Sequence, residues 1–135
     1  MQKEIRQTWF FDQSPQKVWE YLTQPELIEQ WLTKTDFQPI VGHKFHFADK
    51  SGKIIRCEVL EVKPFTQLSY SWQYVSAVDE TLFDSKVFWT LTPKENGTEL
   101  QLVHSAFTYS QDYDAHNNGW NTCLQRVEKL LKTHK

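Results

Sequence analysis

The order of hydrophobic periods along this chain constrains its fold more than any other feature. Residues 3–11 alternate like a strand, and two short helical segments follow at once, each begun by a proline. Ser14 can cap the first of them and Pro15 can open it, because that position needs no amide donor. Pro25 opens the second. A run of strands comes next, and from about Asp112 the period becomes helical. This order predicts one α+β domain that takes in the whole chain.

The middle of the chain predicts a series of strands, most of them with one apolar face. Apolar residues alternate in five stretches, over residues 45–47, 54–62, 68–74, 87–91 and 100–106. The alternation slips between Val59 and Leu60, which indicates a β-bulge. The sequence Lys94-Glu95-Asn96-Gly97 predicts a hairpin turn. Residues 75–83 have the least regular pattern and predict a loop or a weakly patterned edge strand.

Aromatic residues are frequent: nine Phe, six Trp and five Tyr make up 15% of the chain. Such rings bury large apolar areas, while each Tyr and Trp keeps one polar atom that needs a partner. A core of this kind is either filled by interlocking rings or lined by them around a pocket. A length of 135 residues is enough to bury such a core in one domain without disulfides or metals.

The charge and the cysteines exclude several classes of protein. The formal net charge is -2 and the isoelectric point is about 6.2, which argues against binding to nucleic acid or anionic membranes. The chain opens without a signal-peptide core, and no later apolar run would span a bilayer. Cys57 and Cys123 lie far apart in sequence, so we predict two buried, reduced thiols. We expect a cytoplasmic protein with no cofactor, no nucleic-acid partner and no membrane insertion.

A set of motifs occurs in order over nearly the whole chain. They are Ser14-Pro15-x-x-Val18-Trp19, Leu22-Thr23-x-Pro25-Glu26-x-Ile28-x-x-Trp31, Val41-Gly42-x-x-Phe45-x-Phe47, Val59-x-Glu61-Val62-x-Pro64, Leu68-x-Tyr70-x-Trp72, Leu100-x-Leu102-x-His104-Ser105-x-Phe107 and Gly119-Trp120. With these motifs the chain resembles the START-like (SRPBCC) helix-grip superfamily, which includes the birch-pollen allergen and polyketide cyclases. Within it, the chain is most similar to the branch of the C-terminal domain of the activator of heat-shock-protein ATPase. The resemblance implies a curved antiparallel sheet around a long C-terminal helix, with two short helices after the first strand.

Alternation and the resemblance together predict an aromatic face of the sheet turned toward the last helix. The candidate ligand-binding residues on it are Phe45, Phe47, Tyr70, Trp72, Tyr74, Trp89, His104 and Trp120, with Leu91 and Leu102 among them. The resemblance adds His116 as a group at the cavity mouth, and exposure to solvent is the alternative. An aromatic-walled cavity with a few polar groups is the usual form of a small-molecule site. Rings that interlock would instead leave no room for a ligand.

His104 is the polar residue of greatest interest, because alternation places it on the same face as Leu100 and Leu102. It could bond a ligand, or act as an acid or base. The preferred interpretation is a core histidine bonded to a hydroxyl such as that of Ser105 or a tyrosine, since buried polar groups normally find a protein partner. Ser105 itself points to the other face of the strand, so no catalytic residue is predicted.

Histidines and carboxylates elsewhere do not combine into a metal site. His43 and His46 are three residues apart on a strand, which turns them to opposite faces, and the same objection separates Glu58 from Glu61. No thiol or carboxylate completes a zinc set around them. The sequence predicts no metal.

Gly119 and the tryptophans of the first segments are expected to serve packing. A glycine inside a helix costs about 1 kcal/mol relative to alanine, which a close approach of helix to sheet would offset. A hinge is the alternative. Trp9, Trp19 and Trp31 are expected to anchor the two short helices to one end of the sheet. In the alternative interpretation these helices form a lid over the cavity.

These observations favour a binding protein. The first hypothesis is binding of a small hydrophobic, ring-containing molecule between the sheet and the last helix, without catalysis. The alternative that the resemblance suggests is a co-chaperone-like module that regulates the ATPase of a chaperone partner. A third hypothesis, a polyketide cyclase-like enzyme, requires an acid–base pair, and His104 is the single candidate for it.

Overall fold

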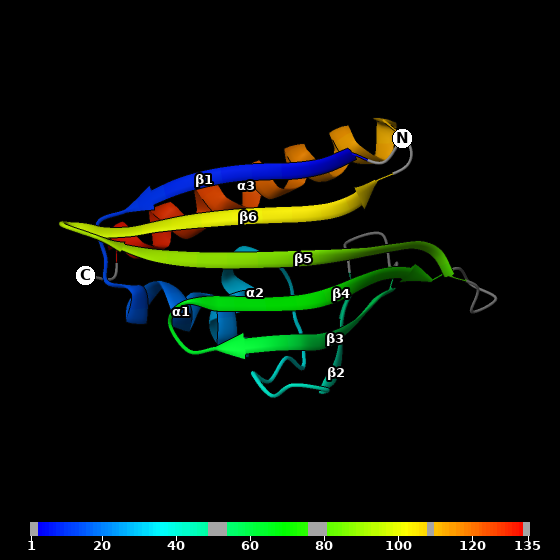
Figure 1. Ribbon diagram of the computed structural model, residues 1–135, viewed down its shortest axis with the longest axis horizontal. Helices are drawn as coiled ribbons and strands as arrows, with labels where there is room; N and C mark the ends of the chain where they lie inside the picture. The colour runs from blue at the N-terminus through cyan, green and yellow to red at the C-terminus, as the bar shows by residue number, and fades with distance from the viewer. Residues whose placement is uncertain (1–2, 49–53, 76–80, 108–109, 134–135) are drawn as a thin grey trace.

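The strands form one antiparallel sheet in the order β1-β6-β5-β4-β3-β2, seen in the computed structural model (Figure 1). The structure describes residues 3–48, 54–75, 81–107 and 110–133. The elements are β1 (Lys3–Phe11), α1 (Pro15–Thr23), α2 (Pro25–Trp31), β2 (Lys44–Ala48), β3 (Ile54–Lys63), β4 (Gln67–Val75), β5 (Thr81–Lys94), β6 (Gly97–Phe107) and α3 (Ser110–Thr133). The predicted α+β order is confirmed, including both ends of β1.

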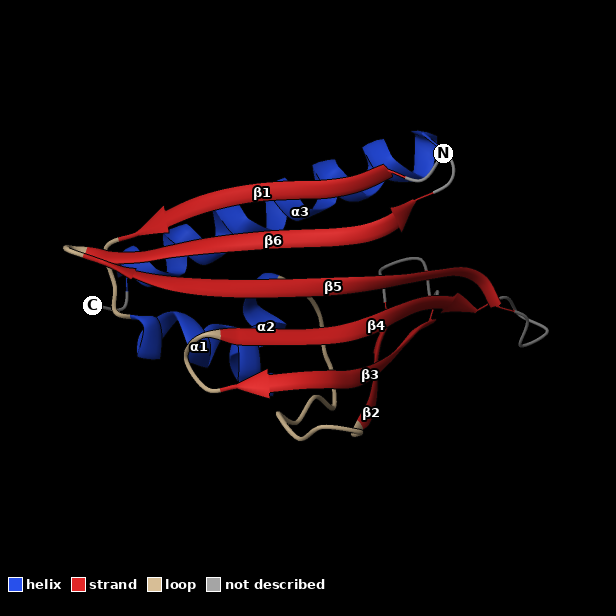
Figure 2. Cartoon of the chain, in the orientation of Figure 1, coloured by secondary structure: helices blue, strands red, loops and turns tan. Residues whose placement is uncertain are grey.

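The two short helices begin at the prolines, as predicted. Figure 2 shows the chain passing from the end of β1 into α1 and α2. The Ser14 hydroxyl accepts a hydrogen bond from the amide of Lys17 at 3.3 Å and so caps α1. Gln24 stands at the corresponding position of α2 and makes no side-chain cap. A tertiary hydrogen bond holds α2 instead. The indole Nε1 of Trp31 donates to the carbonyl oxygen of Tyr21 at 2.7 Å, which connects α2 to α1.

The strand register confirms most of the sequence pattern. The pairing of β3 with β4 shifts between Val59 and Glu61, which is the predicted bulge. Lys94 pairs with Gly97 across the predicted hairpin turn. The prediction for residues 75–83 was wrong at both ends. Val75 completes β4, and residues 81–83 begin β5, which is an interior strand. The residues between them lie outside the described part of the chain.

Helix α3 lies behind β1 and β6 in Figure 1 and covers one face of the sheet. It buries Leu124, Val127 and Leu131 against that face. Two glutamines attach it to the N-terminal segment. Gln7 Nε2 donates to the carbonyl and side-chain oxygens of Asn117 at 3.1 and 2.9 Å. Gln13 Nε2 donates to the carbonyl oxygen of Leu131 at 3.2 Å.

Gly119 does not pack against the sheet, so its predicted role was wrong. The residue is exposed, and a Cβ built on it would meet no atom within 4 Å beyond its chain neighbours and the backbone of its own helix. Its neighbour Trp120 is the residue that faces inward, with 3% of its surface exposed. One step along a helix turns a side chain by about 100°, and this rotation carries Gly119 to the solvent side.

Candidate functional site

Three tryptophans from three different elements meet on the inward face of the sheet. Trp72 on β4 and Trp89 on β5 both contact Trp120 on α3, with ring centroids 5.3 and 5.4 Å apart. Trp31 on α2 extends the row by an edge-on contact with Trp89 at 6.2 Å. The expectation that Trp72, Trp89 and Trp120 share one environment is confirmed. Helix α3 therefore meets the sheet through aromatic rings.

A second group of rings continues this wall toward β2. Phe45 and Phe47 on β2 lie 5.4 Å apart edge to face, and Tyr70 on β4 lies 5.3 Å from Phe45. Phe47 also contacts Trp72 at 5.5 Å, which joins the two groups. Phe37, which sequence reasoning missed, packs on Phe45 at 4.8 Å and is 1% exposed. It lies in an irregular segment, where no alternation could mark it as inward.

His104 is buried in this wall, and both of its ring nitrogens have protein partners. The indole Nε1 of Trp120 donates to Nδ1 at 2.9 Å. Nε2 lies 2.7 Å from the hydroxyl oxygen of Ser85, which in turn donates to the carbonyl oxygen of Trp72 at 3.0 Å. The prediction of a satisfied core histidine bonded to a hydroxyl is confirmed, and the hydroxyl is that of Ser85 rather than Ser105.

The directions of these bonds determine the tautomer of His104. An indole nitrogen can only donate, so Nδ1 must carry a lone pair. Nε2 then carries the proton and donates it to Ser85, whose own proton is used on the carbonyl of Trp72. A doubly protonated ring would set two donors against each other at Nδ1. The relay from Trp120 to Trp72 thus holds a neutral imidazole.

Tyr70 and Trp89 form the second buried polar pair. The indole Nε1 of Trp89 donates to the Tyr70 hydroxyl at 2.9 Å. Burial raises the pKa of the Tyr70 phenol well above its usual range, the bond from Trp89 partly opposes that rise, and Cys57 adds to it. The phenol is therefore neutral and can still act as a hydrogen-bond donor.

The predicted site residues are thus placed as follows. Phe45, Phe47, Tyr70, Trp72, Trp89, His104 and Trp120 are all buried, each with 4% or less of its surface exposed. Tyr74 belongs to β4 and His116 to α3, and their side chains lie outside the described residues. The relay residue Ser85 was not predicted, because its relation to His104 depends on the register between β5 and β6.

Two hollows lined by described residues lie at the surface. One of about 630 Å³ is formed by α1, the start of α2, residues 36–39 and the turn at Phe65. The other, of about 690 Å³, lies over β2, β3 and β4 and includes Lys44, His46 and Arg56. Of the predicted site residues, Phe45 alone appears in the lining described for either hollow.

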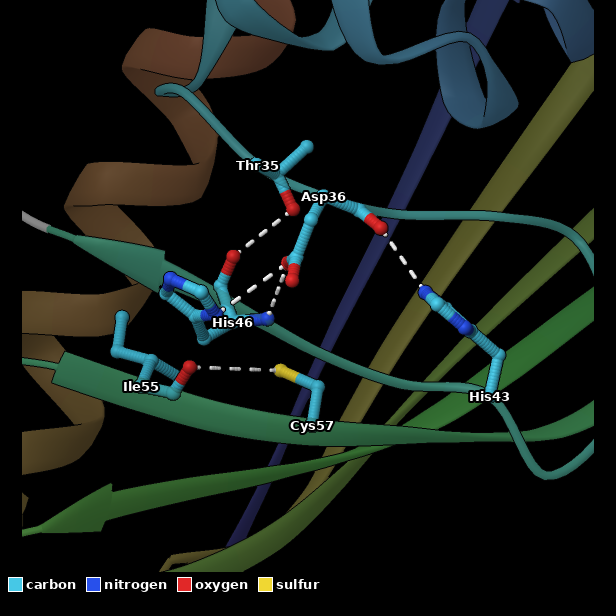
Figure 3. A network of polar contacts seen from close by, with 6 residues as sticks. All are labelled: Thr35, Asp36, His43, His46, Ile55 and Cys57. Atoms are coloured by element: carbon cyan, nitrogen blue, oxygen red, sulfur yellow. Dashed lines mark hydrogen bonds and ion pairs between the residues drawn. The ribbon is translucent and has the colours of Figure 1, made fainter.

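A polar network closes the edge of the sheet at β2 (Figure 3). The amide of His46 donates to the Asp36 carboxylate at 2.9 Å, and the Thr35 hydroxyl donates to the carbonyl oxygen of His46 at 2.9 Å. His43 Nε2 donates to the main-chain oxygen of Asp36 at 2.9 Å. The side chains of Thr35 and Asp36 thus pair with the main-chain groups of His46 that a further strand would otherwise bind. This protects the edge of the sheet against pairing with a strand of another molecule.

The histidines of that network do not belong to a cluster of possible metal ligands among the described residues. Within the described ranges, no three His, Cys, Asp or Glu side chains gather closely enough to hold an ion. Cys57 is buried, and Cys123 is half-buried rather than buried as predicted. Burial, with the nearby charge of Asp36, raises the pKa of the Cys57 thiol far above its usual range.

A curved sheet wrapped around a C-terminal helix, with two short helices after the first strand, defines an α+β helix-grip protein. The chain belongs to the family described as Activator of Hsp90 ATPase homolog 1-like protein, whose model matches residues 12–132. No curated protein matches the sequence significantly. In the part of the chain that is described, no helix is both long enough and apolar enough to cross a membrane.

Solved structures agree with this assignment. The protein MLL2253 from Mesorhizobium loti is 35% identical, with a TM-score of 0.90 over 98% of this chain and 99% of that one. The Aha1 dimer from Colwellia psychrerythraea is 23% identical, with a TM-score of 0.80 over 96% of each chain. DynU16, a protein in the dynemicin biosynthetic locus, is 23% identical, with a TM-score of 0.85 over 98% of this chain and 48% of its own. The last two likenesses concern the fold alone.

Proposed function

We propose that the protein binds a small apolar, ring-containing molecule between the sheet and α3, without catalysis. The observation that carries this proposal is the meeting of Trp72, Trp89 and Trp120, because α3 contacts the sheet through flat rings. Flat rings offer stacking surfaces to a ring-bearing ligand. The described rings already touch one another, so the ligand lies beside Trp72 and Trp120 rather than between them. We include Tyr74 of β4 and His116 of α3 in the proposed site, as wall and mouth.

Polar groups in the wall would set the orientation of the ligand. Tyr70 accepts from Trp89 and has its own hydroxyl proton to give to a ligand. Both nitrogens of His104 are engaged by Trp120 and Ser85, so the imidazole would meet the ligand through its ring face. Acid–base chemistry at His104 would require breaking this relay, which is why the proposal includes no catalytic step.

The neutral dye N-phenyl-1-naphthylamine tests this proposal on the intact protein. We expect its fluorescence to rise on binding and the melting temperature to rise with dye concentration. In ¹H–¹⁵N spectra, the indole Nε1–H signals of Trp72 and Trp120 should shift, whereas that of Trp9 should stay in place. Single Trp→Phe variants assign these signals.

A matched pair of variants keeps the test specific. Leu102→Ala removes a buried side chain from the wall, which enlarges the space beside it and should change the dye affinity. Phe88→Ala removes an outward-facing ring from a residue that is 39% exposed and should leave the dye affinity unchanged. If Leu102→Ala does not fold, the indole shifts of the unmodified protein remain decisive. Absence of dye binding, or shifts confined to Trp9 and Trp19, would overturn the proposal.

Regulation of a chaperone ATPase is the second candidate function. Two findings favour it: the family description names an activator of Hsp90 ATPase, and Ile40 and Val41 stand adjacent with 58% and 63% of their surfaces exposed. Exposed apolar neighbours of this kind suit a protein partner. The test is the ATPase rate of a purified Hsp90-class chaperone with and without this protein. An unchanged rate, or an equal effect from an Ile40→Ser/Val41→Ser variant, would remove this candidate.

A further inference from the structure

The surface hollow beside α1 differs in chemistry from the buried aromatic wall. It is an open hollow of about 630 Å³, a volume within the range of about 300–1,000 Å³ typical of small-molecule sites. Its lining consists of Trp19, Glu20, Thr23, Gln24, Pro25, Asp36, Phe37, Gln38, Pro39 and Phe65. Three aromatic rings and two prolines give it apolar walls. Both charged residues among these are acidic, and none is basic.

Phe65 presents its ring to this hollow from a backbone conformation that side chains rarely adopt. Its φ angle is 68°, in the left-handed region that favours glycine. The turn is held by the amide of Thr66, which donates to Lys63 at 2.9 Å, and by the amide of Leu91, which donates to Thr66 at 2.7 Å. The Phe65 ring is 41% exposed and stands edge-on to Trp19, with centroids 6.1 Å apart. Residues held in such strained conformations cluster at active sites and ligand-binding segments.

The two carboxylates of the lining come from different segments, Glu20 from α1 and Asp36 from residues 36–39. Asp36 is oriented by the amide of His46 at 2.9 Å and lies 3.3 Å from the ring Nδ1 of His46 (Figure 3). About half of the Asp36 side chain, 54%, still faces solvent. Glu20 is 43% exposed and lies 3.6 Å from the ammonium of Lys17, which is outside the lining. Each carboxylate therefore has one neighbour that orients it and a surface left open.

We propose that this hollow binds a small organic cation that carries an apolar or aromatic group, such as an alkyl- or arylammonium ion. The rings of Phe65 and Trp19 would hold the apolar part and face the charge, since aromatic faces attract cations. Glu20 and Asp36 would supply the opposite charge. Apart from Phe37, the lining of this hollow shares no residue with the buried aromatic wall, and the site prefers a charged ligand, so the two proposals can be tested separately.

Benzyltrimethylammonium and its uncharged isostere neopentylbenzene form the matched pair of probes. Titrations followed in ¹H–¹⁵N spectra should show the cation shifting the Trp19 indole signal and the Phe65 amide, and binding at least about fivefold more tightly than the isostere. Equal affinity of the two probes would overturn the proposal. Shifts at Trp72 and Trp120 in place of Trp19 would also overturn it, and would assign the probe to the interior. Binding of a Lys-containing peptide, with none of benzyltrimethylammonium, would overturn it in favour of a protein partner.

Three variants locate the binding determinants. Glu20→Gln/Asp36→Asn should weaken the cation by about fivefold or more and leave the isostere unaffected. Asp12→Asn/Glu95→Gln removes the same charge from exposed residues outside the lining and should leave the cation affinity unchanged. Phe65→Gly removes the ring and relieves the backbone, so the cation affinity should fall while the melting temperature holds or rises. Unchanged affinity in both Glu20→Gln/Asp36→Asn and Phe65→Gly would refute the assignment.

Discussion

The indole Nε1 of Trp120 donates a hydrogen bond to Nδ1 of His104 at 2.9 Å, and this bond joins the middle of α3 to β6. It determines which side of α3 faces the sheet. With Trp120 inward, Leu124, Val127 and Leu131 follow on the same side at helical spacing and are buried. The hydrogen-bond relay that continues through Ser85 therefore fixes the rotation of α3 as well as the tautomer of His104.

Ser85→Ala should destabilise the protein by about 1–3 kcal/mol, because it removes the acceptor of a buried His104 N–H. The matched control is Ser105→Ala, one residue after His104 on the other face of β6, which should change the unfolding free energy by less than about 0.5 kcal/mol. Urea unfolding measures both. In addition, ¹⁵N shifts of the imidazole should report the Nε2–H tautomer in the unmodified protein. Equal costs for the two serines, or the Nδ1–H tautomer, would contradict the relay.

The two glycines Gly119 and Gly97 should respond to alanine in opposite directions. Gly119 lies exposed in α3 with open space around its Cβ position, so Gly119→Ala should stabilise the protein by about 0.5–1 kcal/mol. A Cβ at Gly97 would overlap the carbonyl oxygen of Phe11, so Gly97→Ala should lower stability markedly. Thermal unfolding of both variants checks this. A destabilising Gly119→Ala would mean that Gly119 contacts another part of the protein.

Alternation predicted the faces of the strands because strand geometry is local. On β4, Leu68, Tyr70 and Trp72 are all buried, as their spacing of two residues requires. Contacts that depend on how the strands pair with one another were not predicted. Ser85 lies two residues before Val87 on β5, and Val87 pairs with His104 on the neighbouring strand β6, so Ser85 can reach the imidazole. The register between β5 and β6 cannot be read from the sequence of either strand alone. For the candidate site, the sequence identified the inward rings but neither the relay nor the hollow at Phe65.

The rotation of α3 was the second point that the sequence left open. Both Cys123 and Leu124, and both Leu130 and Leu131, fit a helical apolar stripe. The structure buries Leu124 and Leu131 and leaves Cys123 and Leu130 half-buried. The contacts of Trp120 with the sheet set which residue of each pair is buried. The hydrophobic pattern of a single sequence cannot distinguish two consecutive apolar residues that both fit the apolar stripe of a helix.

The two cysteines should differ in reactivity toward thiol reagents. Cys57 is buried and its raised pKa keeps it a thiol, whereas the thiolate is the reacting form. Cys123 is half-buried on α3. At pH 8, Ellman's reagent should therefore modify one thiol in the folded protein and the second only after denaturation. Cys123→Ser should abolish the first reaction. Rapid modification of Cys57 in that variant would show that β3 opens to solvent and does not keep this thiol buried.

Tyr70→Phe should lower the free energy of unfolding near neutral pH. It should also make the fall of that free energy at alkaline pH less steep. The substitution leaves the buried Nε1–H of Trp89 without its acceptor, at a cost of about 1–3 kcal/mol. The folded-state pKa of Tyr70 lies above that of the unfolded chain, so this residue contributes fully to stability below about pH 10. Above that pH the unfolded state releases the phenol proton first, and stability falls by up to about 1.4 kcal/mol per pH unit. Urea unfolding between pH 7 and 11 should show a shallower decline in Tyr70→Phe than in the unmodified protein, and parallel declines would mean that Tyr70 ionises in the fold.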